Sequence, residues 1–193
     1  MKKVKQLISY FSLMLTASLF FIACNNADDK KDTATTEVKP AESTHAIAAL
    51  TATMPDTALT GTADFMVQDG KVKLSLTLSI PAMANKSVAV HIHEMGDCGD
   101  MGKGAHGHWN PTGQQHGKWG SASFHAGDIG NVSLDSTGNG TLQLETDLWT
   151  IGGDAKTDVL NHSIIVHSGV DDFTTQPTGN AGSRIGCGVI IKQ

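Results

Sequence analysis

The chain contains almost no arginine and, after the three lysines of its first five residues, no long basic run. Arg184 is the single arginine among 14 basic side chains, and the formal net charge of the 193 residues is −5. Proteins that bind nucleic acid present a basic patch or stripe to the phosphate backbone. The sequence therefore argues against nucleic acid as a partner. It also lacks internal repeats and any stretch with a helical hydrophobic period.

Residues 1–23 have the composition of an export signal. Three lysines precede an apolar run from Leu7 to Ala23, and Cys24 follows directly. A basic start, an apolar stretch and a small residue before the cleavage point describe a secretory signal, and a cysteine at this place is typical of a bacterial lipoprotein. A transmembrane anchor is the alternative, but four serines and threonines dilute the run. We predict a lipoprotein signal peptide over 1–23 and a lipid on Cys24.

Residues 24–44 are predicted to form a lipid-anchored flexible tether. The stretch 25–44 is rich in Asp, Lys and Thr and has almost no large apolar side chain, so it cannot bury a core. Removal of 1–23 also removes three lysines and no acidic residue, which changes the net charge from −5 to −8. The expected product is exported and membrane-anchored, and it faces the periplasm or the cell exterior.

From residue 46 onward, apolar residues alternate with small or polar ones at the period of two that β-strands show. Asp69-Gly70 lies between two such segments and is a strong hairpin signal. Together with 21 glycines, the pattern predicts an all-β barrel or sandwich. The expected strands are 46–53, 60–68, 71–80, 87–93, 130–134, 140–145, 163–167 and 185–191.

Eight of the nine histidines lie between residues 91 and 167, and six of these eight form, with Asp128, a single array of side chains that can bind metal. Imidazole is a common copper and zinc ligand, and carboxylate joins it readily at zinc. The strand period places the rings of His91 and His93 on one face. A loop as long as 108–128 inside a compact domain is usually functional or disordered. The expected metal-binding side chains are His91, His93, His108, His116, His125, Asp128 and His167.

The segments around these residues have a recognisable form. They resemble the copper,zinc superoxide dismutase family, with their motifs in the family's order over roughly residues 45–193. The resemblance implies an eight-stranded antiparallel Greek-key β-barrel with long metal-binding loops. The segments are VAVHIHEMGDC (88–98), GHWNPTGQQHGKWG (107–120), FHAGDIGNVSLD (124–135), IIVHSGVDD (164–172) and GNAGSRIGCGVI (179–190).

The resemblance also implies two metals that share one histidine. Four nitrogens suit tetragonal Cu(II), whereas three nitrogens and one carboxylate suit a closed tetrahedral zinc site. Copper would then be the redox centre and zinc would be structural. The matching copper ligands are His91, His93, His108 and His167, and the matching zinc ligands are His108, His116, His125 and Asp128.

Other family positions are matched outside the ligands. Arg184 matches an arginine beside copper, which would attract and orient a small anion; a surface arginine is the alternative. Asp171 matches a carboxylate that links a copper-ligand histidine to a zinc-ligand histidine. Cys98 and Cys187 match the family's disulfide, and cysteines of exported proteins usually pair; two free thiols are the alternative.

The function implied by the resemblance is dismutation of superoxide to dioxygen and hydrogen peroxide, with His108 and Arg184 as the catalytic side chains. An exported copper/zinc buffer or carrier on the same fold is the alternative, and a degenerate structural domain is a second one. A carrier needs neither a zinc site nor Arg184, and a degenerate domain would have lost ligands. The oligomeric state is open between a monomer and a homodimer.

Two features depart from the family pattern. The segment 168–183 is short and contains no lysine or glutamate, whereas the corresponding loop of many family members is longer and charged and steers superoxide. Only Lys103, Lys118 and Arg184 could then supply a steering field. His106, two residues before His108, is either an accessory ligand or a solvated loop histidine.

Overall fold

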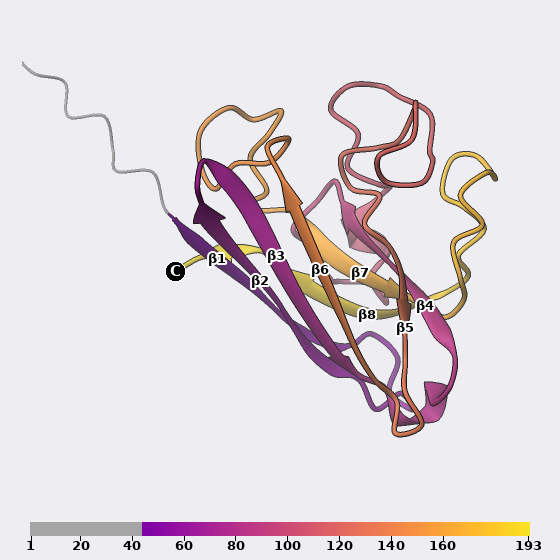
Figure 1. Cartoon of the computed structure of the whole chain (residues 1–193). Coiled ribbons are helices and arrows are strands. Elements are labelled where there is room, and N and C mark those ends of the chain that lie inside the picture. The colour runs from indigo at the N-terminus through magenta and orange to yellow at the C-terminus, as the bar shows by residue number, and fades with distance from the viewer. Residues whose placement is uncertain (1–43) are drawn as a thin grey trace, which may run out of the picture. The chain divides into compact units, whose positions relative to one another are not determined.

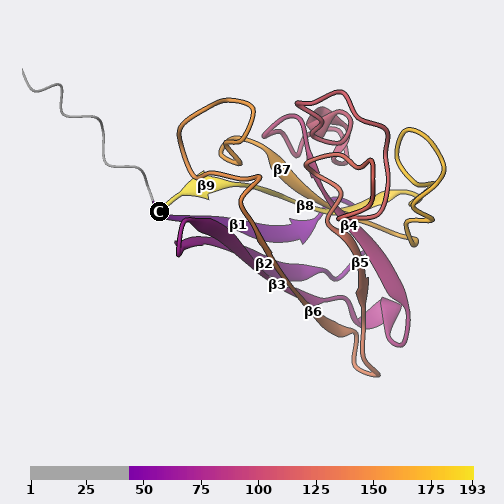
Figure 2. The same ribbon diagram turned by 45° about the horizontal axis from the view of Figure 1, so that its top comes forward.

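The computed structural model describes residues 44–193. This unit is one antiparallel sheet in the order β5-β4-β7-β8-β1-β2-β3-β6, with β9 beside β1. The sheet coils into a flattened barrel with β1, β2, β3 and β6 on one side and β4, β5, β7 and β8 on the other (Figures 1 and 2). The predicted signal peptide, Cys24 and the tether up to residue 43 lie outside the described residues. The strands are β1 His45–Ala52, β2 Thr60–Gln68, β3 Lys71–Ser79, β4 Ser87–His93, β5 Gly130–Ser133, β6 Asn139–Thr146, β7 Ser163–His167, β8 Arg184–Val189 and β9 Ile191–Lys192.

The all-β prediction is confirmed, and seven of the eight expected strands end within one residue of the predicted positions. The last one is wrong as a single strand. The main chain of Ile190 pairs instead with the loop before β7: its N–H donates to His162 O at 2.9 Å, and its carbonyl accepts from Asn161 N at 3.0 Å. The chain therefore leaves β8 at Val189 and resumes against β1 as β9.

The hairpin between β2 and β3 has the predicted turn. Asp69 and Gly70 both adopt positive φ, at 52° and 78°. A two-residue turn with this backbone matches the right-handed twist of the strands that it joins. The register of β2 and β3 is continuous from Gln68↔Lys71 to Thr60↔Ser79.

Strands β4 and β7 are buried on both faces, and this burial positions the site. Val88, Val90 and Ile92 of β4 point into the main core. Since side chains alternate along a strand, His91 and His93 point to the opposite face. The loops over 94–129 and 168–183 lie side by side over that face in both views (Figures 1 and 2).

A disulfide ties the first of these loops to the barrel. Cys98 pairs with Cys187 of β8 across 89 residues, with a Cα–Cα distance of 5.7 Å. Cys187 also packs with Ile165 and Ala105 in a small cluster beneath the loop. In residues 44–193 the helical segments are the short 3₁₀ turns Pro81–Met83 and Lys103–Ala105, and no helix there is long and apolar enough to cross a membrane.

Candidate metal centre

Two neighbouring strands present three of the predicted ligands on one face. His91 of β4 lies opposite Ile165 of β7, and His167 is two residues further along β7. His93 forms an isolated bridge with His108, which brings the start of the long loop back to the sheet. The four histidines are at most 4% exposed. The fold thus gathers four imidazoles from three segments in one buried group: His91, His93, His108 and His167.

In each strand histidine, one ring nitrogen forms a hydrogen bond outside this group. The other ring nitrogen faces the group. Hydrogen bonds to the far nitrogen fix the tautomer and the ring orientation. The nitrogens left facing the group are Nδ1 of His91 and Nε2 of His93 and His167. The bonds are His91 Nε2 to Asp171 Oδ2 at 2.9 Å, His93 Nδ1 to His106 O at 2.9 Å and His167 Nδ1 to Gly182 O at 3.3 Å.

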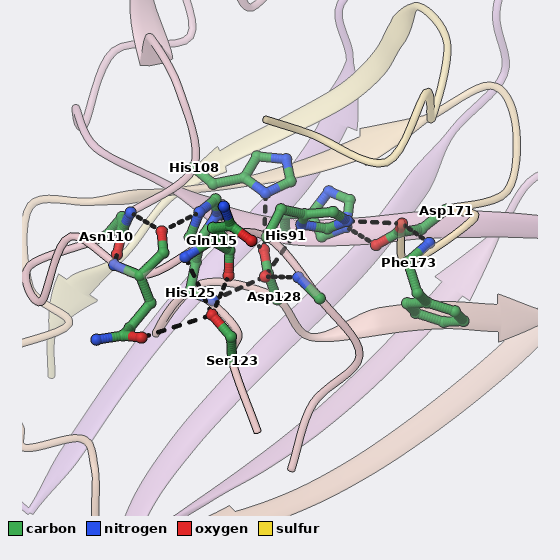
Figure 3. A network of polar contacts seen from close by, with 12 residues as sticks. His91, His108, Asn110, Gln115, Ser123, His125, Asp128, Asp171 and Phe173 are labelled. Carbon is green, nitrogen blue, oxygen red and sulfur yellow. Dashed lines mark hydrogen bonds and ion pairs between the residues drawn. The ribbon is translucent and has the colours of Figure 1, made fainter. Parts of the chain in front are cut away.

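A second buried group surrounds Asp128. The Nδ1 atoms of His108, His116 and His125 lie 2.8, 3.0 and 3.3 Å from its carboxylate oxygens. Figure 3 shows His108 and His125 converging on Asp128, with His91 beyond them. His108 belongs to both groups, because its Nδ1 faces Asp128 and its Nε2 faces the strand histidines. All seven predicted ligands are therefore brought together as two groups that share His108.

These groups contain the orphaned polar side-chain atoms of residues 44–193. Four buried ring nitrogens have no hydrogen-bond partner there: Nδ1 of His91, His116 and His125, and Nε2 of His108. A buried polar atom without a partner is costly and rare in a native fold. Since all four face one of the two groups, cations bound there would satisfy them. The donor sets thus fit metal ions.

Burial keeps three of the four histidines of the first group, His93, His108 and His167, in the form that binds metal. It is the main cause that lowers the pKa of His108 to about 4 and that of His167 to about 3. Burial also lowers the pKa of His93 well below its usual range, and neighbouring His108 adds to the effect. These imidazoles are therefore neutral at pH 7 and can each bind one metal without losing a proton, whereas binding of two metals by His108 would remove its remaining ring proton.

Asp128 is ionised in spite of its burial. Burial alone would raise its pKa, but the hydrogen bond from His108, the ring of His125 at 3.3 Å and the backbone N–H groups of His125 and Gly117 outweigh it and lower the pKa. The second group therefore supplies three imidazole nitrogens and one negative oxygen.

Asp171 links the two groups, as predicted from its place in the sequence. One carboxylate oxygen is 2.9 Å from Nε2 of His91, and the other is 2.9 Å from Nε2 of His116. The side chain of Asn131 holds this residue from β5: its amide donates to Asp171 O at 2.9 Å and its oxygen accepts from Asp171 N at 2.8 Å. The neighbouring Asp172 is exposed.

Arg184 lies half-buried beside the first group. Its guanidinium donates to Gly102 O at 2.6 Å and to His106 O, so the loop held by the disulfide fixes its position. Arg184 pairs with His167 between β7 and β8, and it binds the same carbonyl, His106 O, as His93; its positive charge contributes to the lowered pKa of His93 and of His167. Together with Lys103 it lines a cavity of about 270 Å³.

His106 contributes its backbone and not its ring. The side chain is exposed and belongs to neither metal-binding group of residues 44–193. Its carbonyl accepts one bond from His93 Nδ1 and another from Arg184. These contacts do not support the interpretation of His106 as an accessory ligand. Its carbonyl instead joins Arg184 to His93.

Comparisons with known proteins agree with this geometry. The family model of copper/zinc superoxide dismutase (SODC) matches residues 59–190, more than half of the chain. A superoxide dismutase [Cu-Zn] 2 of Aquifex aeolicus is 40% identical over 110 residues, which are 55% of this chain and 64% of the relative. A superoxide dismutase [Cu-Zn] of Paramecium bursaria Chlorella virus 1 is 35% identical over 136 residues, 67% of this chain and 71% of the relative.

A solved structure, that of the clock protein EA4, is also similar to this fold. It superposes with a TM-score of 0.68 and 29% sequence identity over 79% of this chain and 96% of the other. The matched segments span 64% and 65% of the two Aquifex relatives, just under two thirds of their length.

The fold and the paired ligand groups define a β-barrel metalloprotein with two adjacent sites. The chain belongs to the copper/zinc superoxide dismutase family. Membership implies copper and zinc as cofactors, and the donor sets described above fit both metals.

Proposed function

We propose that this protein dismutates superoxide to dioxygen and hydrogen peroxide. The observation that carries the proposal is the sharing of His108 between an all-imidazole group and a group with a carboxylate, with Arg184 paired to His167 of the first. We assign copper to the first group, where it would supply the one-electron chemistry, and zinc to the second. A buffer or carrier of metal needs no such shared ligand, and no observation favours it over the enzyme.

His108 is the side chain that can hold a proton between the two groups. Its Nδ1 stays with Asp128 at 2.8 Å, so the ring keeps its orientation while Nε2 is free to take or release a proton. Because burial lowers the pKa of His108 to about 4, a proton on Nε2 is readily given up at neutral pH. A general acid placed in this way can protonate a reduced oxygen species bound beside it.

Arg184 is the side chain that can receive the anion. A guanidinium has five N–H donors, and only two of its nitrogens are engaged, each with one carbonyl. The remaining donors and the fixed charge can orient a small anion next to His93 and His167. Burial lowers the pKa of Arg184, yet a guanidinium remains charged at any physiological pH.

One experiment tests the activity. Copper and zinc should be measured on the same purified sample in which superoxide consumption is followed, with the metal-free protein as the control. We expect both metals near one per chain and a consumption rate far above that of the control. A fully loaded protein that consumes superoxide no faster than the metal-free chain would overturn the proposal.

We also propose that the protein is exported and anchored through a lipid on Cys24, on the strength of the sequence of residues 1–24. The thiol is the attachment atom, so Cys24→Ser should remove the lipid and release the protein from membranes. Fractionation and metabolic labelling with a fatty acid check this. A serine variant that stays in the membrane fraction with its label would contradict lipidation at Cys24.

A further inference from the structure

The zinc-type ligand His116 lies in a stretch of chain without backbone support. The N–H groups of Gln114, Gln115, His116 and Gly117 all donate to side chains, and none donates to a carbonyl of the main chain. By contrast, the chain next to His108 and Asp128 is bound to β4, because Trp109 N donates to Ile92 O and Ile92 N donates to Gly127 O, both at 2.9 Å. The position of His116 therefore depends on the side chains that hold its backbone.

One side chain holds both backbone groups of His116. Gln176 Oε1 accepts from His116 N at 2.9 Å, and Gln176 Nε2 donates to His116 O at 2.9 Å. A carboxamide paired in this way imitates the bonding of a neighbouring β-strand, because it offers one acceptor and one donor side by side. Gln176 stands 60 residues further along the chain, in the short loop over 168–183.

That loop is itself held in place against His116. Asp172 accepts the N–H groups of Thr174 and Thr175 at 2.9 and 2.7 Å, which fixes the turn before Gln176. The loop then passes so close that a Cβ at Gly179 would lie 1.8 Å from Asp171 Oδ1 and 2.6 Å from His116 Nε2. Only glycine fits there. The loop can therefore lie close enough to His116 for Gln176 to bind its backbone.

We infer that Gln176 is a positioning residue for the second metal group and sets how firmly His116 holds zinc. The loop over 168–183 binds His116 at two points: Asp171 binds its ring and Gln176 binds its backbone. The same loop has no lysine that could steer an anion. None of the hydrogen bonds of Gln176 goes to a histidine of the first group. The effect is therefore confined to the second group. The inference rests on the proposed assignment of zinc to that group.

The test replaces Gln176 in the full-length, metal-loaded protein. Gln176→Ala removes both bonds, and Gln176→Glu keeps an acceptor for His116 N but sets a carboxylate against His116 O. Loss of a partner that supports a metal ligand typically costs about 10–100-fold in metal affinity. We expect zinc release to a chromogenic chelator to accelerate by about that factor in both variants, while copper is retained.

Thr174→Ala is the matched control. It removes an exposed side-chain bond to Asp172 in the same loop and leaves His116 untouched, so zinc release should equal that of the wild type. The visible spectrum of the protein with Co²⁺ at the zinc site gives a second readout, since a moved His116 changes the ligand field. We expect a shifted spectrum for both Gln176 variants and an unchanged one for Thr174→Ala.

The outcomes separate this inference from the proposed function. Wild-type release rates and spectra in both Gln176 variants would overturn it, as would equal loss of copper and zinc, which would mean that Gln176 supports the whole loop. A wild-type protein that binds no zinc would instead overturn the assignment of the second group. None of these readouts depends on superoxide consumption.

Discussion

Asp128→Ala should empty the second metal group of zinc while copper stays bound. Asp128 is the only charged ligand in that group, and its oxygens lie 2.8 to 3.3 Å from three imidazole nitrogens. It also accepts the backbone N–H groups of His125 and Gly117 at 2.8 and 3.1 Å. Its removal takes away the anion that offsets the charge of zinc and the acceptor that orders the loop. We expect zinc affinity to fall by more than about 100-fold.

Competition with a chelator of known affinity measures the zinc loss, and the electron paramagnetic resonance signal of Cu(II) reports the first group. Asp128→Asn separates charge from shape, because the amide oxygen can still accept the two backbone bonds. Asp135→Ala is the control, since that carboxylate is exposed and accepts backbone N–H groups only in the turn between β5 and β6. Parallel loss of both metals from Asp128→Ala would show that the ligands are divided wrongly between the groups.

The strands could be predicted because burial on one face imposes a period of two on the sequence. The limit of this signal is visible at Ile190. The alternation of residues 185–189 ends in three consecutive apolar residues, Val189, Ile190 and Ile191, and the main chain of Ile190 pairs with His162 and Asn161 instead of β7. A short apolar run of this kind fits a continuous strand as well as an interrupted one, so the pattern does not reveal the change of hydrogen-bonding partner.

The ligands could be predicted because their chemistry restricts residue type: only histidine and a few other side chains bind copper or zinc. The residues that were missed act through chemistry that many side chains share. Gln176 and Asn131 bond to the main chain of residues 60 and 40 positions away, and any loop carboxamide could do the same. At His106 the carbonyl acts, and every residue has one, so the side chain was misleading.

The first group sits on a rigid part of the molecule, and the second depends on loops. His91, His93 and His167 come from strands paired on both sides, so their rings are placed by the barrel. His116 and His125 come from a loop stabilised by side chains. The copper-type group should therefore keep its shape when the loops are perturbed, and zinc binding should be the more sensitive property. This difference is what the variants at Asp128 and Gln176 exploit.

Arg184→Ala should slow superoxide consumption by about 10-fold or more with both metals bound. Arg184 is the only arginine in the chain, and Lys103, which lines the same cavity, is drawn toward Asp100 at 3.8 Å. Few other cations can therefore compensate. Arg184→Glu should be slower still, because a repelling charge replaces an attracting one. Arg184→Lys should fall between the wild type and Arg184→Ala, since the charge stays but the fork that binds Gly102 O and His106 O is lost.

Ionic strength distinguishes attraction of the anion from support of the loop. Salt shortens the reach of a charge to about 8 Å near 0.15 M, so the wild-type rate should fall as salt is added, and the rate of Arg184→Ala should fall less. Lys86→Ala is the control, because it removes one positive charge from an exposed position outside the cavity that Arg184 lines; it should keep both the rate and the salt dependence. If the Arg184 variants, fully loaded with copper, matched the wild type in rate and in salt dependence, Arg184 would serve only to hold the loop between Cys98 and His106.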